Sequence, residues 1–228
     1  MIYGLFGLAL VVIGVFIYSE MRQKPLRSFA LKGLSSAMFI AIYLYGVATT
    51  TSIQSYPLVV GFFGIGLVFG LIGDLVLALR SMRPQEDNHR IILYGTLSFS
   101  IGHVFYYMAL LKYGSFEVLA ILIALILSNA TFLASRVMRL NWGPSKWPSL
   151  VYSFFLFLVA AQSLLIVINN GFSSYHTTLL LGSVLFAVSD LVLAQIYFAP
   201  KPMTQLIPIN LSLYYAAQLL LAFSISLI

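Results

Sequence analysis

Two aspartates are the residues in this sequence whose type and setting best suit chemistry. Asp74 and Asp190 lie well inside long apolar stretches, and Leu-Val-Leu-Ala follows each of them. A carboxyl group in an apolar helix costs about 2.5–3.5 kcal/mol to insert into a membrane, so it needs a partner or a function. Two carboxyl groups can divide acid–base work, because one can donate a proton while the other stabilises a cation or activates water.

Further polar residues interrupt the apolar stretches and are candidates to bind or orient a substrate: Lys32, His103, Tyr106, Asn210, Tyr214 and Gln218. The last three recur every four residues, so on a helix they form one polar stripe. Gly66 and Gly70 precede Asp74 at the same spacing. Because glycine lets another helix approach closely, we expect Asp74 to point into a bundle. We also expect that one polar cavity could hold the two aspartates and these polar residues other than Tyr106.

Some of these residues also have a structural interpretation. Lys32 could neutralise one aspartate, or it could extend to the cytoplasmic surface. His103 is as compatible with a hydrogen-bonded core histidine as with a catalytic one. A single lysine cannot neutralise two aspartates, so a structural role does not account for both carboxyl groups.

The composition predicts that a membrane positions these side chains. Of the 228 residues, 61% are hydrophobic and only 8% are charged, whereas about a quarter of the residues of a soluble domain are charged. A spanning helix needs about 20 apolar residues, and eight stretches qualify: 2–18, 28–48, 57–79, 91–111, 116–135, 148–168, 176–198 and 207–227. We therefore expect an all-α, multi-pass protein with one membrane domain, residues 1–228. The first span lacks a basic start and a cleavage site, and we expect it to be retained.

Basic residues gather in every second connection between the spans. Lys112 is in an even connection, and the other eleven of the 12 Lys and Arg residues are in or beside the odd ones: Arg22, Lys24, Arg27, Lys32, Arg80, Arg83, Arg90, Arg136, Arg139, Lys146 and Lys201. Basic connections stay in the cytoplasm. This predicts non-cytoplasmic termini, and an inner-membrane location in a bacterium. It also explains the net charge of +6 without a nucleic-acid partner.

The two aspartate segments suggest an internal repeat. Gly66 to Leu79 can be aligned with Gly182 to Gln195, and Tyr106-Tyr107 with Tyr214-Tyr215. An even number of spans per unit makes such a repeat parallel, which predicts two four-helix halves, 1–112 and 113–228. The alternative is chance recurrence of Leu, Val, Ala and Gly in membrane helices.

Several kinds of chemistry have no support in this sequence. It has no cysteine, so disulfides, thiolate metal sites and cysteine nucleophiles are excluded. It also lacks the motifs of serine hydrolases, zinc proteases and P-loop proteins. We expect no metal and no other cofactor.

The candidate residues resemble a known family. Gly73-Asp74, His103 with Tyr106, Ser189-Asp190, and Tyr214 with Gln218 are similar in type and order to the YhhN-like lysoplasmalogenases, which are eight-span membrane hydrolases. At the start of the second span that family tends to have Lys-Pro, whereas this chain has Lys32-Gly33. The resemblance implies hydrolysis of the vinyl ether bond of lysoplasmalogens, which releases a fatty aldehyde and glycerophospho-ethanolamine or -choline. It also implies that the two aspartates are catalytic.

The chemistry of a vinyl ether agrees with this implication. Its β-carbon accepts a proton from an acid, and water then captures the resulting oxocarbenium ion; glycosidases use paired carboxyl groups for a similar division of work. The other polar residues would orient the aspartates and the water, and Lys32 would meet the phosphate of a lysophospholipid drawn from the membrane. The sequence leaves open which aspartate is the acid, and it leaves the oligomeric state open.

Two other functional classes fit the same residues. Midplane acids and parallel repeats also occur in transporters, here a proton-coupled carrier of a small amphiphile. Transporters often interrupt their helices at the site, but no proline lies beside either aspartate. The remaining class, a structural scaffold, has no use for two buried acids.

Overall fold

The chain folds into eight long α helices. We describe a computed structural model in which residues 2–22, 24–201 and 203–228 are defined. Within these residues the helices are α1 (Ile2–Met21), α2 (Pro25–Thr49), α3 (Pro57–Ala78), α4 (Asn88–Tyr113), α5 (Val118–Val137), α6 (Lys146–Asn170), α7 (Ser174–Phe198) and α8 (Ile207–Ser224). Each is long and apolar enough to cross a membrane, and the described residues contain no strand. This confirms the predicted all-α class and the eight spans.

Several helices run beyond the apolar stretches that predict them. α4 begins at Asn88 and α6 at Lys146, because backbone hydrogen bonding continues into the polar interface. The ends carry ordinary signals: Pro25 and Pro57 open their helices, where the missing proline N–H costs nothing. Gly171 connects α6 to α7 with a φ of +78°, a left-handed conformation that glycine adopts readily.

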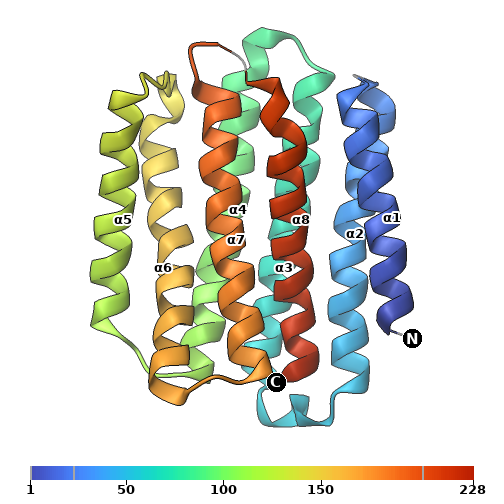
Figure 1. Ribbon diagram of the computed structural model, residues 1–228, viewed down its shortest axis with the longest axis vertical. Helices are drawn as coiled ribbons and strands as arrows, with labels where there is room; N and C mark the ends of the chain where they lie inside the picture. The colour runs from blue at the N-terminus through green and yellow to red at the C-terminus, as the bar shows by residue number, and fades with distance from the viewer. Residues whose placement is uncertain (1, 23, 202) are drawn as a thin grey trace.

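The helices run alternately up and down in a single bundle. In Figure 1, α1 and α2 lie at one edge and α5 and α6 at the other, with α7 and α8 in front of α3 and α4. The connections α1–α2, α3–α4, α5–α6 and α7–α8 all lie at the upper end, and both termini lie toward the lower end. The basic connections therefore share one end of the molecule, which we call the basic end.

Glycine brings α3 against its neighbours. A Cβ atom at Gly66 would lie 2.5 Å from the Tyr106 ring and 3.1 Å from the carbonyl oxygen of Gly102, both in α4. A Cβ atom at Gly70 would lie 2.8 Å from Nε2 of Gln218 in α8. Helices in a membrane gain from such close packing because the apolar surroundings provide little hydrophobic drive between them. The expected role of the glycines before Asp74 is confirmed.

The same helix pairings recur in the two halves of the chain. α1 packs on α2, α2 on α3 and α3 on α4, just as α5 packs on α6, α6 on α7 and α7 on α8. Across the halves, α2 contacts α8 and α6 contacts α4. A parallel repeat would produce this pattern, and the repeat of residues 1–112 and 113–228 stays a prediction.

The charge distribution predicts that the basic end faces the cytoplasm. A reporter that is active only outside the cytoplasm should work when it is fused after Ile228, and should be silent when it is inserted in the α3–α4 connection. A reporter that is active only in the cytoplasm should give the reverse. A cytoplasmic C-terminus would overturn this orientation.

The packing of α3 predicts different effects of alanine at two of its glycines. Gly66→Ala should lower the free energy of unfolding by about 1–3 kcal/mol, because the added methyl group overlaps Tyr106 and a backbone oxygen that has little room to move. Gly61→Ala is the matched control, since nothing lies within 4 Å of its Cβ position. Thermal unfolding in detergent measures both variants, and equal stabilities would contradict the close α3–α4 contact.

Candidate functional site

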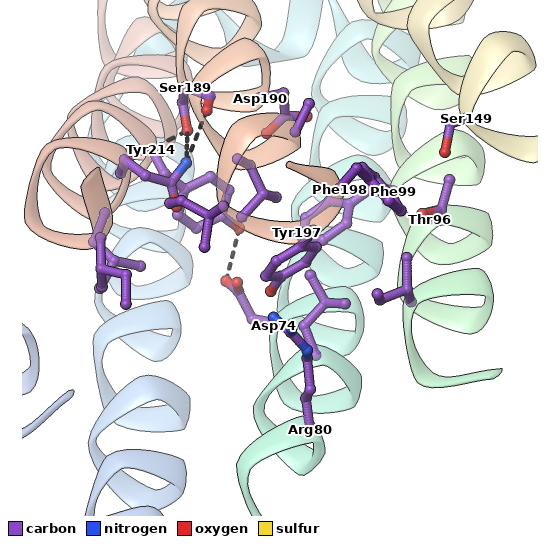
Figure 2. A pocket seen from close by; sticks show the side chains of 18 of the residues that line it. Asp74, Arg80, Thr96, Phe99, Ser149, Ser189, Asp190, Tyr197, Phe198 and Tyr214 are labelled. Carbon is purple, nitrogen blue, oxygen red and sulfur yellow. Dashed lines mark hydrogen bonds between the residues drawn. The ribbon is translucent and has the colours of Figure 1, made fainter. Parts of the chain in front are cut away.

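A cavity of about 410 Å³ lies toward the basic end of the bundle. All eight helices contribute residues to its lining, which includes both Asp74 and Asp190. Five of the predicted site residues face this cavity: Lys32, Asp74, Asp190, Asn210 and Tyr214. Figure 2 shows side chains from α3, α4, α6, α7 and α8 around it.

The Asp74 carboxyl group joins three helices. Ser36 of α2 and Tyr214 of α8 each donate a hydrogen bond of 2.7 Å to its Oδ2 atom, and Figure 2 shows the Tyr214 bond. The Nζ atom of Lys32 lies 3.4 Å from Oδ1. A cation and two hydroxyl donors therefore surround the carboxyl group of Asp74, a residue that is only 2% exposed, which is the arrangement that stabilises a buried carboxylate.

A chain of hydrogen bonds extends from Asp74 into the bundle. Gln218 Nε2 donates to the Tyr214 hydroxyl oxygen over 3.0 Å, and the Tyr106 hydroxyl donates to Gln218 Oε1 over 3.2 Å. Three predicted residues, Tyr106, Gln218 and Tyr214, therefore form a chain of hydrogen bonds that ends at the Asp74 carboxyl group. The Tyr214 hydroxyl is fixed as a donor to Asp74, because it is itself an acceptor from Gln218.

Asp190 has a different environment. The Tyr152 hydroxyl of α6 donates a hydrogen bond to its Oδ2 atom. Among the described residues, no Lys, Arg or His nitrogen lies within ion-pair distance of this carboxyl group. Asp190 is also less buried than Asp74. The two aspartates therefore line one cavity with unequal partners, since one has a cation and the other has a single phenol.

Asn210 fixes α7 against α8 beside Asp190. Its Nδ2 atom donates to the backbone oxygen of Ser189 over 2.8 Å and to the Ser189 hydroxyl over 3.0 Å. The Ser189 hydroxyl donates back to the Asn210 backbone oxygen over 3.3 Å, and Figure 2 shows part of this cluster. Since Ser189 directly precedes Asp190, these bonds hold the backbone that carries the carboxyl group.

The expectation of one shared cavity is wrong for His103 and Gln218, which do not line it. Tyr106 does not line it either. Nδ1 of His103 is 2.9 Å from the Phe99 carbonyl oxygen of its own helix, and its ring packs edge-on against Phe186 at 4.7 Å. The described residues give it no hydrogen bond to either aspartate. The bundle surrounds this histidine with aromatic rings, which helical spacing within α4 does not show.

Sequence reasoning missed Tyr152, the hydrogen-bond partner of Asp190. Tyrosines are frequent in this chain, with 14 in total, so residue type alone does not single one out. The predicted repeat would offer a signal, because Tyr152 precedes Asp190 by 38 residues and Ser36 precedes Asp74 by the same 38. Both hydroxyls donate to the aspartate of their own half.

Comparison with known proteins identifies the family. The model of the YhhN family matches residues 27–225, which is most of the chain. The chain belongs to the YhhN family. This confirms the resemblance seen in the sequence, and the matched region contains every candidate site residue. No curated protein and no solved structure matches the chain.

Within this YhhN-family chain, the cavity is the candidate active site. Its chemical groups are carboxyl groups, phenols, hydroxyls and amides, which suits proton transfer. Among the described residues, no cluster of three or more His, Asp and Glu side chains is placed to hold a metal ion.

The ion pair of Lys32 and Asp74 should contribute to stability. Lys32→Met leaves a buried carboxylate without its cation and should lower the free energy of unfolding by roughly 3 kcal/mol. The double variant Lys32→Met with Asp74→Asn removes both charges and should recover much of this loss. Thermal unfolding is the measurement, and the exposed Lys24→Met is the control. If Lys32→Met were as stable as this control, the pair would have no structural importance.

Proposed function

We propose that this YhhN-family protein hydrolyses the vinyl ether bond of lysoplasmalogens, releasing a fatty aldehyde and glycerophospho-ethanolamine or -choline. The observation that carries the proposal is the pair of aspartates with unequal partners on one cavity inside a membrane bundle. Family membership and the eight apolar helices support a membrane hydrolase. We place a single-chain lipid in this cavity, which all eight helices line.

The partners of the two aspartates suggest their roles. Asp74 accepts two hydroxyl hydrogen bonds and faces an ammonium group, so we assign it the role of the carboxylate. Asp190 has no such cation among the described residues, and burial opposes a lone charge. We therefore assign Asp190 the role of the acid, with Tyr152 holding one of its oxygens and leaving the other for the proton.

These roles give a balanced reaction. The Asp190 carboxylic acid transfers its proton to the β-carbon of the vinyl ether, which forms an oxocarbenium ion. The Asp74 carboxylate stabilises this cation and takes a proton from the attacking water, which gives a hemiacetal. Asp74 then returns that proton to the glycerol oxygen while Asp190 takes the hemiacetal hydroxyl proton. The carbon–oxygen bond breaks, the aldehyde leaves, and both aspartates regain their first protonation states.

A proton-coupled carrier of an amphiphile is the main alternative. Broken helices mark the sites of many transporters, but α3 and α7 continue without interruption past their aspartates. Incubation of the purified protein with a lysoplasmalogen and with its saturated alkyl-ether and acyl analogues separates the two functions. Release of aldehyde from the vinyl ether alone supports the hydrolase, and its absence overturns it.

The assigned mechanism predicts that Asp74→Asn and Asp190→Asn each abolish hydrolysis. An amide keeps the shape of the carboxyl group but neither donates an acidic proton nor carries negative charge, so about 100-fold or more of the rate should be lost. The measurement is aldehyde release at matched membrane expression. The wild type should show a bell-shaped pH profile, because one proton is shared between two carboxyl groups.

Asp87→Asn is a suitable control, because Asp87 lies in the α3–α4 connection and does not line the cavity. This variant should retain its activity. Near-normal turnover in Asp74→Asn and Asp190→Asn would refute the two-carboxylate mechanism.

A further inference from the structure

Two cations line the cavity among the described residues, and only one of them is neutralised. The Nζ atom of Lys32 lies 3.4 Å from Oδ1 of Asp74, so the Asp74 carboxylate neutralises the charge of Lys32. The other cation is Arg80, in the short 3₁₀ turn Leu79–Ser81 that follows α3. No carboxylate of the described residues lies within ion-pair distance of its guanidinium, and none of their oxygen atoms accepts a hydrogen bond from it.

An aromatic ring holds this arginine in place. The guanidinium carbon of Arg80 lies 4.3 Å from the centre of the Tyr197 ring of α7, and Tyr197 also lines the cavity. Figure 2 shows the two side chains close together, on the same side of the cavity as Asp74. Stacking covers a face of the guanidinium but leaves the N–H groups at its edge free to bind an anion such as phosphate.

The position of Arg80 just beyond the end of α3 suits a lipid headgroup. Arg80 is six residues beyond Asp74, which corresponds to about 9 Å along a helix axis. It lies at the boundary of the apolar span Pro57–Ser81, the level at which lipid phosphates meet a membrane protein. A lysophospholipid with its glycerol beside the aspartates would have its phosphate near this level.

We propose that Arg80, held by Tyr197, binds the phosphate of the lysophospholipid substrate and thereby selects phosphate-bearing single-chain lipids. The inference rests on the proposed function and moves the phosphate contact expected at Lys32 to another residue. In this assignment Lys32 forms an ion pair with the Asp74 carboxylate, and Arg80 binds the phosphate of the headgroup. Arg80 is a binding residue in this assignment and takes no part in proton transfer.

The test compares two ligands that lack a vinyl ether bond and so are not hydrolysed. These are a 1-O-alkyl lysophosphoethanolamine and the 1-O-alkylglycerol of equal chain length, which lacks the phosphate. Their affinities for protein purified in a phosphate-free maltoside detergent are measured from the intrinsic tryptophan fluorescence, to which Trp142 in the cavity lining contributes, and from ligand-induced thermal stabilisation.

We expect Arg80→Gln to weaken binding of the phosphate-bearing ligand by about 10- to 100-fold, the usual range for a hydrogen-bonded charge pair. Affinity for the alkylglycerol should stay within a factor of about 2. Arg80→Lys should restore part of the loss, because it keeps the charge but not the planar fork. Arg83→Gln is the matched control, since Arg83 is exposed and does not line the cavity.

Three outcomes would overturn the inference. In the first, Arg80→Gln leaves the affinity for the phosphate-bearing ligand unchanged. In the second, it weakens both ligands equally, as loss of a general anchor or of the fold would. In the third, inorganic phosphate at millimolar concentration competes as well as the lipid, which would point to a free anion and not to a lipid headgroup.

The binding test also separates this inference from the proposed function. If the wild type binds the phosphate-bearing ligand through Arg80 but releases no aldehyde from a lysoplasmalogen, the hydrolase proposal fails and the phosphate site stands. If aldehyde is released but Arg80→Gln changes neither the affinity nor KM, the hydrolase stands and the phosphate site fails.

Discussion

The burial of the Asp74 carboxyl group between helices is the constraint on which the rest of this site depends. A lone carboxylate inside a membrane bundle is costly, and removal of either partner of a buried ion pair leaves an uncompensated charge. Lys32 and Ser36 come from α2 and Tyr214 comes from α8. To satisfy one side chain of α3, the bundle must therefore bring together helices from both halves of the chain.

This requirement extends well beyond the carboxyl group. For the Tyr214 hydroxyl to donate to Asp74, Gln218 must approach α3, and Gly70 provides the space for it. Tyr106 reaches Gln218 from α4, across the backbone contact that Gly66 allows. Glycine spacing, helix packing and the orientation of polar groups are thus parts of one arrangement. Small residues let the backbones approach, and the polar side chains then find partners without water.

The two aspartates have different hydrogen-bond and charge partners, and this difference would determine which carboxyl group carries the proton. Ser36 and Tyr152 each precede an aspartate by 38 residues and donate to it. The aspartates are 116 residues apart, and the residue 116 positions after Lys32 is Pro148. A repeat would thus supply a hydroxyl to both aspartates but a cation to only one. Two equal carboxyl groups would share a proton without preference, whereas unequal partners allow one to remain charged while the other carries the proton.

Local patterns in the sequence were enough to predict the helices and the acids. Each span is a long and mostly apolar stretch, and the spacing of Gly66, Gly70 and Asp74 within one helix predicts the face that packs inward. Hydropathy and helical periodicity act over a few turns, so they can be read without knowledge of neighbours. The candidate residues also sufficed to indicate the family.

Only the tertiary structure decided which polar groups meet. The choice of Asp74 as the partner of Lys32, the contact of Tyr152 with Asp190 and the enclosure of His103 by aromatic rings all join different helices. Such contacts depend on the rotation and depth of each helix relative to its neighbours. The rotation and depth of a helix are determined by packing between residues that are far apart in the chain. No pattern within one span contains that information.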